Sequence, residues 1–120
     1  VFGVCILMEM LWLHSTPIEA AEFFHGPFEI VDRQVPLVLI IGEDPSRPLM
    51  ERVKRFCDTY AGRVMVYDSR DYAMPGVDPA IRPIVAPYVL QAALKRLSVH
   101  LSDLNGQPLT TRRYMWKVPY

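Results

Sequence analysis

Residues 35–44, VPLVLIIGED, carry the clearest strand signal in the chain. Their apolar run from Leu37 to Ile41 is unbroken, and Gly42 ends it. Hydrophobicity that is continuous rather than alternating is typical of a parallel strand covered on both faces. The stretch RVMVYDS at residues 63–69 predicts a second strand. These two segments predict the sheet around which the rest of the chain folds.

Helical patterns lie on either side of these strands. Residues 1–15 are apolar nearly all round, which predicts a helix buried on most of its faces. Residues 49–60 and 88–104 place apolar side chains at three- and four-residue intervals, which predicts two further helices. The order helix, strand, helix, strand, helix, with intervals too long for hairpins, predicts an α/β fold: a three-layer parallel sheet flanked by helices.

Prolines and glycines predict the irregular parts of the chain. Residues 18–24 suggest a short helical turn before Gly26-Pro27 redirects the backbone, and residues 28–32 suggest a short extended segment. The proline-rich passage at residues 74–87, MPGVDPAIRPIVAP, predicts an irregular crossover. Asn105-Gly106 predicts the cap that ends the last helix.

Length, charge and cysteine usage restrict the class of protein. The 120 residues suit one core, yet two strands are few for a parallel sheet, so we expect residues 1–104 to be an incomplete domain of a longer protein. A formal net charge of +0 argues against nucleic acid or an anionic membrane as a partner. The N-terminal apolar run is shorter than the roughly 20 residues that span a membrane. Because Cys5 and Cys57 are isolated, we expect free thiols in a reducing cytoplasm.

Glu9 is the first candidate for chemistry, because it is the only charged residue among the first 13. Burying a carboxylate without a partner costs several kcal/mol or turns it into a proton carrier near neutral pH. Two ordinary interpretations remain open beside this one. The side chain could lie at an exposed edge of the helix, or it could pair with an arginine elsewhere in the chain.

His25 is the second candidate. Phe23 and Phe24 can anchor the preceding turn in the core, while Gly26 and Pro27 restrict how the backbone leaves it. A rigid turn holds an imidazole at a fixed angle, and imidazole exchanges protons near neutral pH. Glu22 lies one helical turn earlier and could orient the ring. The alternative is a histidine that merely fills a core or loop position.

The tail at residues 105–120 has aromatic and basic residues but no helical period. Lys117 and the Arg112-Arg113 pair could form a solvated basic end. Alternatively the tail folds back over a phosphate- or carbonyl-bearing substrate, with Tyr114 and Trp116 buried to hold it there.

Metal or cofactor binding is not expected from this sequence. His14, His25 and Glu22 match no ligand spacing that indicates a metal site, and no Gly-rich phosphate loop or dinucleotide motif is present. His14 and His100 lie beside apolar residues in predicted helices, so we interpret both as structural.

Several of these features together resemble the sugar isomerase (SIS) family of ketose-phosphate enzymes. They are Glu9, His14, the string AEFFHGP with His25 sixteen positions after Glu9, the strand that follows and the basic tail. The longer string EFFHGPFEIVD and the ending TRRYMWKV look more like the bacterial fructosamine-6-phosphate deglycases, in particular those of enteric bacteria that act on 6-phosphofructose-aspartate. The resemblance implies that the chain is the C-terminal part of a two-domain enzyme, with an incomplete second SIS domain at residues 1–104.

The resemblance also implies roles for individual residues. Glu9 would move a proton between C1 and C2 of the sugar, His25 would assist ring opening, and Lys117 would bind substrate from a tail that folds toward the active site. A homodimer that shares its active sites between subunits is implied as well. The function implied is hydrolysis of a ketosamine 6-phosphate to glucose 6-phosphate and an amino acid.

Two other functions stay open. An aldose–ketose isomerase or amidotransferase of the glucosamine-6-phosphate synthase type would use the same Glu and His and differ in the fate of the nitrogen on C1. A non-catalytic SIS domain would instead sense a sugar phosphate for a DNA-binding partner, and Glu9 and His25 would then be dispensable.

Overall fold

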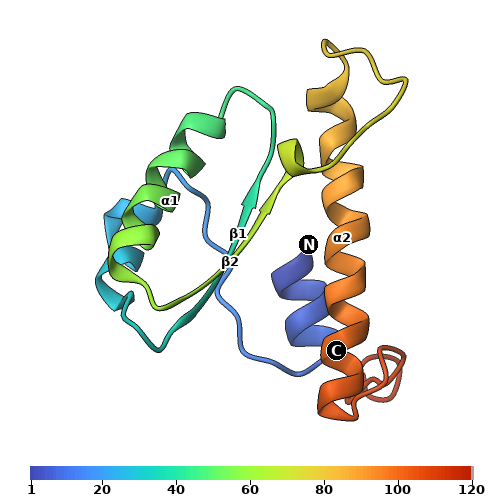
Figure 1. Cartoon of the computed structure of the whole chain (residues 1–120). Coiled ribbons are helices and arrows are strands. Elements are labelled where there is room, and N and C mark those ends of the chain that lie inside the picture. The colour runs from blue at the N-terminus through green and yellow to red at the C-terminus, as the bar shows by residue number, and fades with distance from the viewer. Residues whose placement is uncertain (120) are drawn as a thin grey trace. The chain divides into compact units, whose positions relative to one another are not determined.

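The computed structural model describes residues 1–119 and contains a parallel pair of strands (Figure 1). Strand β1 is Pro36–Ile41 and strand β2 is Arg63–Asp68. They pair in register from Pro36 opposite Arg63 to Ile41 opposite Asp68. Both predicted strands and their parallel direction are confirmed.

Helix α1, Arg47–Tyr60, connects these two strands, as a parallel pair requires. Its buried apolar residues, Val53 and Cys57, lie on one stripe and belong to the same core cluster as Leu39 of β1. The core cluster consists of Phe23, Leu39, Val53 and Cys57. Partly buried neighbours surround it, among them Phe24, Phe28, Met50, Phe56, Val64 and Val66.

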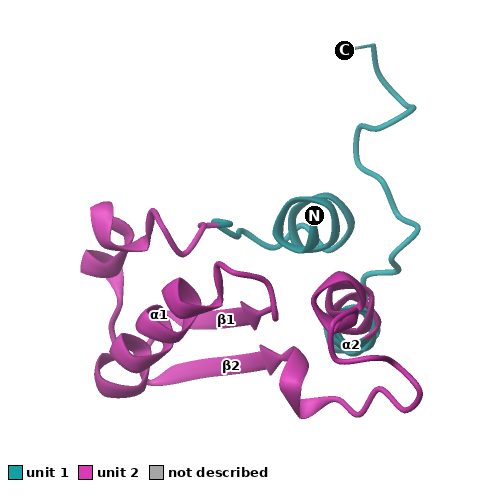
Figure 2. Cartoon of the chain, turned by 90° about the horizontal axis from the view of Figure 1, so that it is seen from above, with its two compact units in different colours: residues 1–17, 93–120 teal, residues 18–92 magenta. Residues whose placement is uncertain are grey.

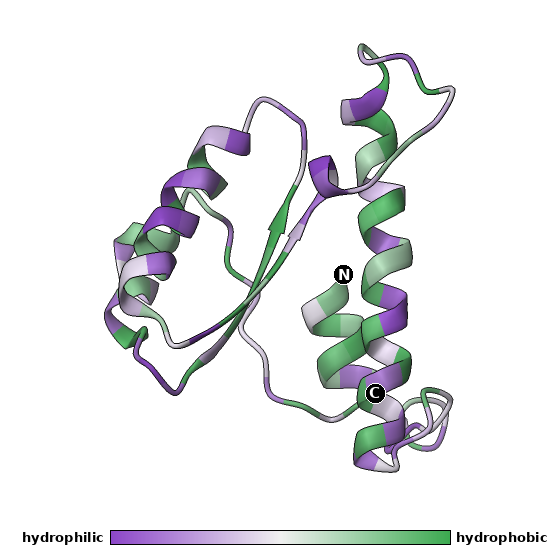
Figure 3. Ribbon diagram, viewed as in Figure 1, coloured by the Kyte–Doolittle hydropathy of each residue, from purple (hydrophilic) through white to green (hydrophobic). Residues whose placement is uncertain are grey.

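The second face of the sheet is partly exposed, whereas the sequence predicted that both faces would be covered. Along β1 the buried residues Leu39 and Ile41 alternate with Val38 and Ile40, which are 39% and 37% exposed. Met65 of β2 is also exposed. The strand is apolar along its whole length (Figure 3), so its sequence cannot distinguish the covered face from the open one.

Helix α2, Arg82–Asn105, begins six residues before the predicted start at residue 88. The proline-rich passage is therefore only partly irregular, because Pro83 and Pro87 lie within the helix. Pro83 is tolerated because the first turn of a helix has no intrahelical partner for its N–H groups. The predicted cap is confirmed: Gly106 has φ 59, its N–H donates to the Asp103 carbonyl, and the Gln107 N–H donates to Ser102.

The N-terminal helix ends earlier than predicted, and its winding is that of a π-helix. It is a π-helix, η1, over Phe2–Met10, whereas the apolar pattern predicted a helix to residue 15. The chain after η1 turns back along the helix, and a hydrogen bond from the Ser15 hydroxyl to the Gly3 carbonyl, 2.8 Å long, holds it there. A Cβ on Gly3 would lie 2.8 Å from a ring carbon of Pro17, so this return needs glycine.

Two short 3₁₀ turns follow, η2 at Phe23–His25 and η3 at Pro27–Ile30. The predicted helical turn is largely confirmed, since the Glu22 N–H donates to the Glu19 carbonyl and η2 continues the turn, whereas the predicted extended segment at residues 28–32 is wrong over most of its length. Pro27 begins η3, and its fixed φ suits the first position of a helical turn. A third turn, η4 at Ser69–Asp71, follows β2.

The chain divides into two compact units (Figure 2). Unit 1 comprises Val1–Pro17 and Ala93–Tyr120, and unit 2 is Ile18–Ala92. Helix α2 contributes its first half to unit 2 and its second half to unit 1. Within residues 1–119, no helix combines the length and the apolar character needed to cross a membrane.

Candidate active site

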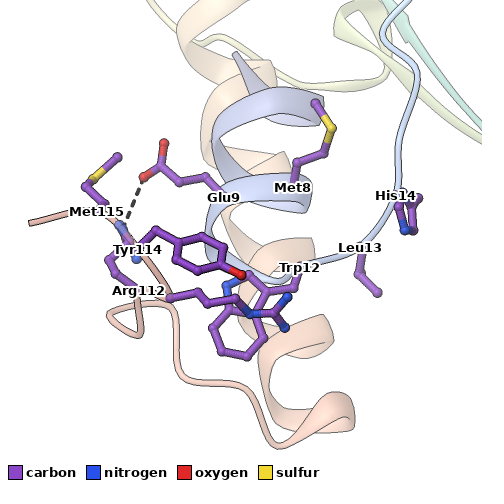
Figure 4. A pocket seen from close by; sticks show the side chains of 9 residues that line it. Met8, Glu9, Trp12, Leu13, His14, Arg112, Tyr114 and Met115 are labelled. Atoms are coloured by element: carbon purple, nitrogen blue, oxygen red, sulfur yellow. Dashed lines mark ion pairs between the residues drawn. The ribbon is translucent and has the colours of Figure 1, made fainter. Parts of the chain in front are cut away.

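Glu9 lies on η1 and lines a pocket of about 370 Å³ within unit 1 (Figure 4). The walls come from η1, from the turn that follows it and from the C-terminal tail. The lining residues are Met8, Glu9, Trp12, Leu13, His14, Arg112, Arg113, Tyr114 and Met115. The tail thus lies against the helix that carries the acidic candidate, although the two are about a hundred residues apart in the sequence.

Glu9 is neither buried nor unpaired, so the expectation of unpaired burial is wrong. Its side chain is 30% exposed, and its Oε1 lies 3.2 Å from Nε of Arg112. Of the interpretations that the sequence left open, the structure supports the one in which Glu9 pairs with an arginine elsewhere in the chain. Its partner could not be chosen from the sequence, because nothing in the pattern of the tail distinguishes Arg112 from Arg113.

Arg112 is held by the tail itself. Its Nη1 donates to the carbonyls of Leu109 and Thr111 at 2.8 and 2.9 Å. Its Nε is buried but not aligned with an acceptor, so the contact with Glu9 is an ion pair and not a directed hydrogen bond. The guanidinium is therefore fixed by backbone and keeps a charge beside the carboxylate.

Arg113 takes a different position. Its Cζ lies 4.2 Å from the centre of the Trp12 ring, the arrangement of a cation–π contact. Trp12 has φ 55, in the left-handed region that bulky residues rarely adopt. Such a conformation persists only where surrounding contacts hold it.

Lys117, the predicted substrate-binding lysine, is not among the residues that line the pocket. Its side chain is exposed, and its Nζ donates to the Arg112 carbonyl at 2.6 Å. In this structure it stabilises the fold of the tail next to Arg112.

His25 lies at the end of η2 in unit 2 with its side chain 69% exposed. Its Nδ1 is 3.1 Å from Oε2 of Glu22, so the predicted partner does orient the ring. The predicted anchor is confirmed, since Phe23 is buried and Phe24 packs partly buried against it. The next residue, Gly26, has φ 147, which lets the backbone turn away directly after the imidazole. This histidine is held on a short rigid turn and points its ring toward solvent.

The remaining histidines and cysteines show no site of their own. His14 is exposed and lies outside any helix, which corrects its predicted helical setting, while His100 is exposed on α2. Cys57 is buried, which raises the pKa of its thiol, and Cys5 is half-buried. Among residues 1–119, no group of three or more His, Cys, Asp or Glu side chains is placed to hold a metal ion.

Charged residues at the carboxyl ends of both strands were not predicted. Arg47 is buried and donates two hydrogen bonds to Asp68, one to the Gly42 carbonyl and one to Glu51. These bonds hold the pKa of the Asp68 carboxyl below its usual value. The available signal was an acid at or near the carboxyl end of each predicted strand, Glu43 and Asp68, because the carboxyl ends of parallel strands meet at one edge.

A second pair lies at the same edge. Arg82 donates to both carboxylate oxygens of Glu43 at 2.8 and 3.0 Å, and this lowers the pKa of Glu43. Ser69 is fully buried beside them, and its hydroxyl has no hydrogen-bond partner among the described residues. Because each charge at this edge is matched by an opposite one, we interpret these residues as structural.

Comparisons with known proteins give this geometry a family. No family model matches the chain. The fructosamine deglycase FrlB of Bacillus subtilis (strain 168) is 43% identical over 119 residues, which cover 99% of this chain and 36% of that protein. A fructoselysine 6-phosphate deglycase of Escherichia coli O157:H7 is 35% identical over 112 residues, 93% of this chain and 32% of that protein.

Solved structures agree with these relatives. A candidate phosphosugar isomerase from Bacillus subtilis superposes with a TM-score of 0.95 at 43% identity, covering 99% of this chain and 36% of that one. A second, from Salmonella typhimurium LT2, gives 0.90 at 35% identity, covering 98% of this chain and 36% of that one.

The fold is therefore that of a phosphosugar isomerase domain, as the sequence predicted. The chain is a homologue of the bacterial fructosamine deglycases. It spans about a third of the length of the deglycases that it matches.

Proposed function

We propose that this chain is part of a cytoplasmic enzyme that hydrolyses a phosphorylated Amadori compound, a ketosamine 6-phosphate, into glucose 6-phosphate and an amine. The single observation that carries this proposal is the Glu9 carboxylate on the wall of a pocket that basic tail residues also line. The likeness to fructosamine and fructoselysine 6-phosphate deglycases supports the substrate class.

In the proposed reaction Glu9 transfers a proton between neighbouring carbons. It takes a proton from C1 of the open-chain ketosamine and returns one to C2, while the nitrogen on C1 gives up its proton and the C2 oxygen takes one up, so that the C2 ketone becomes a hydroxyl and the C1–N bond becomes an imine. Water then adds at C1, and the C–N bond breaks to release the amine and leave the aldehyde of glucose 6-phosphate. General acid–base catalysis of this kind contributes about 10²–10⁴-fold per group.

His25 is proposed to open the sugar ring by moving a proton to the ring oxygen. The imidazole of His25 is exposed and is oriented by Glu22, which suits a group that acts outside its own unit. We propose that it acts in the active site of a second subunit of a homodimer. Lys117 is proposed to bind substrate, and this requires its ammonium group to leave the Arg112 carbonyl.

The test of Glu9 is Glu9→Gln in the full-length protein, assayed on a fructosamine 6-phosphate. Substrate affinity should stay within a few-fold, while kcat falls at least 100-fold, the low end of the range for a lost acid–base group. The control is Glu19→Gln, because Glu19 is exposed, nearby in sequence and outside the pocket. A Glu9→Gln variant with near-normal turnover would remove the proposal.

The shared site has a test of its own. Inactive Glu9→Gln and His25→Gln subunits are mixed under conditions that exchange subunits. Half of the dimers should then be mixed with one of their two sites intact, and the whole mixture should regain up to about a quarter of the parental activity. Exchange without any recovered activity would count against a site shared between subunits.

An aminotransferase or isomerase is the second candidate function. The observation that favours it is a glutamine–fructose-6-phosphate aminotransferase of Sphingobium yanoikuyae, 29% identical, whose match covers 96% of this chain and 79% of that protein. Product analysis separates the two. A deglycase releases free amine and glucose 6-phosphate, whereas an aminotransferase makes glucosamine 6-phosphate from fructose 6-phosphate and glutamine.

A further inference from the structure

The pocket beside Glu9 contains more positive than negative charge. Its lining includes one carboxylate, Glu9, and two guanidinium groups, Arg112 and Arg113. Arg112 is already engaged with Glu9 and with two backbone carbonyls. No carboxylate within residues 1–119 lies within ion-pair distance of Arg113, so its charge remains available to a ligand.

Arg113 is also held in one orientation. Its guanidinium lies over the face of Trp12 at 4.2 Å, and a stacked guanidinium keeps its N–H edge free for two parallel hydrogen bonds to a carboxylate. The backbone of Trp12 adopts φ 55, a conformation that costs on the order of 1–3 kcal/mol for a residue other than glycine. The structure thus maintains a strained platform under a cation that no described residue neutralises.

We infer that this pocket binds the carboxylate of the amino acid carried by the ketosamine, with Arg113 as the residue that recognises it. The inference rests on the proposed function, in which Glu9 acts at C1. The nitrogen on C1 bears the amino acid, so the amino-acid part of the substrate is the part that must lie closest to Glu9. The phosphate is at C6, the far end of the sugar.

The apolar walls fit the same occupant. Met8, Trp12 and Met115 line the pocket together with the two arginines, and methionine side chains adapt to ligands of different shape. A cation fixed on one wall with flexible apolar groups on the others is suited to a constant carboxylate and a variable side chain. The structure therefore assigns to Arg113 the distinction between amino-acid conjugates and conjugates of simple amines.

The experiment compares two substrates in the full-length protein. One is the fructosamine 6-phosphate of an amino acid, and the other is the conjugate of the same amine without its α-carboxylate. In Arg113→Gln, kcat/KM for the first substrate should fall roughly 10- to 100-fold through KM, as for a lost charge-assisted hydrogen bond, while kcat/KM for the second stays unchanged. Arg113→Lys, which keeps the charge without the paired donors, should fall between.

The matched control is Arg96→Gln, since Arg96 is exposed on α2 within the same unit and does not line the pocket. It should leave both substrates unaffected. Equal losses on both substrates in Arg113→Gln would place this arginine on a part that they share, such as the phosphate, and would overturn the inference. Unchanged kinetics would overturn it too.

Failure of the proposed function is recognised separately, from the parent protein alone. If the parent cleaves neither conjugate, the deglycase proposal falls and the role of Arg113 falls with it. If the parent cleaves both conjugates equally well, the deglycase proposal stands and the carboxylate inference is refuted.

Discussion

The two units of this chain are built in different ways. Unit 2 has a contiguous apolar core on one face of its sheet, and its buried arginine is matched by carboxylates at hydrogen-bond distance. Unit 1 buries few residues, namely Leu11, Leu94 and Ser98, and arranges its charged and aromatic groups around an open pocket. The difference indicates that unit 2 contributes most of the buried core, whereas unit 1 holds the pocket beside Glu9.

Arg47→Met should lower the free energy of unfolding more than any other substitution discussed for this chain. The substitution leaves Asp68 largely buried without its partner and also removes bonds to Gly42 and Glu51. Removing one member of a buried ion pair destabilises a protein by about 3–5 kcal/mol. The free energy of unfolding, measured by urea denaturation, should fall by that amount.

Its control is Arg55→Met on the same helix, since Arg55 is exposed. A change within about 0.5 kcal/mol is expected there. A loss below about 1 kcal/mol in Arg47→Met would show that the strand ends do not depend on this pair, and the contrast between the units would weaken.

Acid should affect unit 2 through the same ion pairs. Hydrogen bonds from Arg47 lower the pKa of Asp68, and those from Arg82 lower the pKa of Glu43, relative to ordinary values of 3.8 and 4.5. A carboxyl whose pKa is lowered by folding contributes stability that is complete above its unfolded pKa and is lost as pH falls through its folded pKa.

The contribution of these two carboxyl groups to the free energy of unfolding should therefore stay constant down to about pH 4.5 and decline below it. Urea denaturation between pH 6 and pH 3 measures the decline. The variant Glu43→Gln should show a shallower decline, because one of the carboxyl groups whose pKa is lowered by folding is gone. An equally steep decline in this variant would contradict the assignment for Glu43.

Arg112→Met is the counterpart of Arg47→Met in unit 1 and should cost less, about 1–2 kcal/mol. The pair with Glu9 is not aligned as a hydrogen bond, and Glu9 keeps 30% of its side chain in contact with solvent. The same urea experiment compares the two methionine variants directly. Equal losses would mean that the tail contributes as much to stability as the buried pair of unit 2 does.

The sequence predicts unit 2 well because its elements follow local rules. A continuous apolar run made β1, a second one made β2, and the three- and four-residue spacing made α1. The exposed face of the sheet escaped prediction, since Val38 and Ile40 are as apolar as their buried neighbours. The start of α2 was missed because prolines normally indicate irregular chain, yet Pro83 lies in the first turn, which accepts proline, and Pro87 lies inside the helix.

The sequence predicts less of unit 1, where the important features come from residues far apart. An apolar pattern does not distinguish a π-helix from an α-helix, so the winding of η1 could not be predicted. The pattern also continues beyond Met10, so the helix was expected to be longer. The pair between Glu9 and Arg112 joins opposite ends of the chain, which no local spacing reveals. Glu9 and His25 could be named as candidates because a lone charge in an apolar run and a histidine before Gly-Pro are visible one residue at a time.

The smallest predicted effect concerns the end of α2, from which the tail of unit 1 starts. Gly106 has φ 59 and closes the helix through bonds at Asp103 and Ser102, so a Cβ there introduces backbone strain although nothing lies within 4 Å of it. Gly106→Ala should destabilise by about 1 kcal/mol, and Gly106→Asn by less, because asparagine tolerates the left-handed region. Thermal unfolding of both variants measures the difference. Equal stability of the alanine and asparagine variants would mean that the strain is relieved by a shift of the tail.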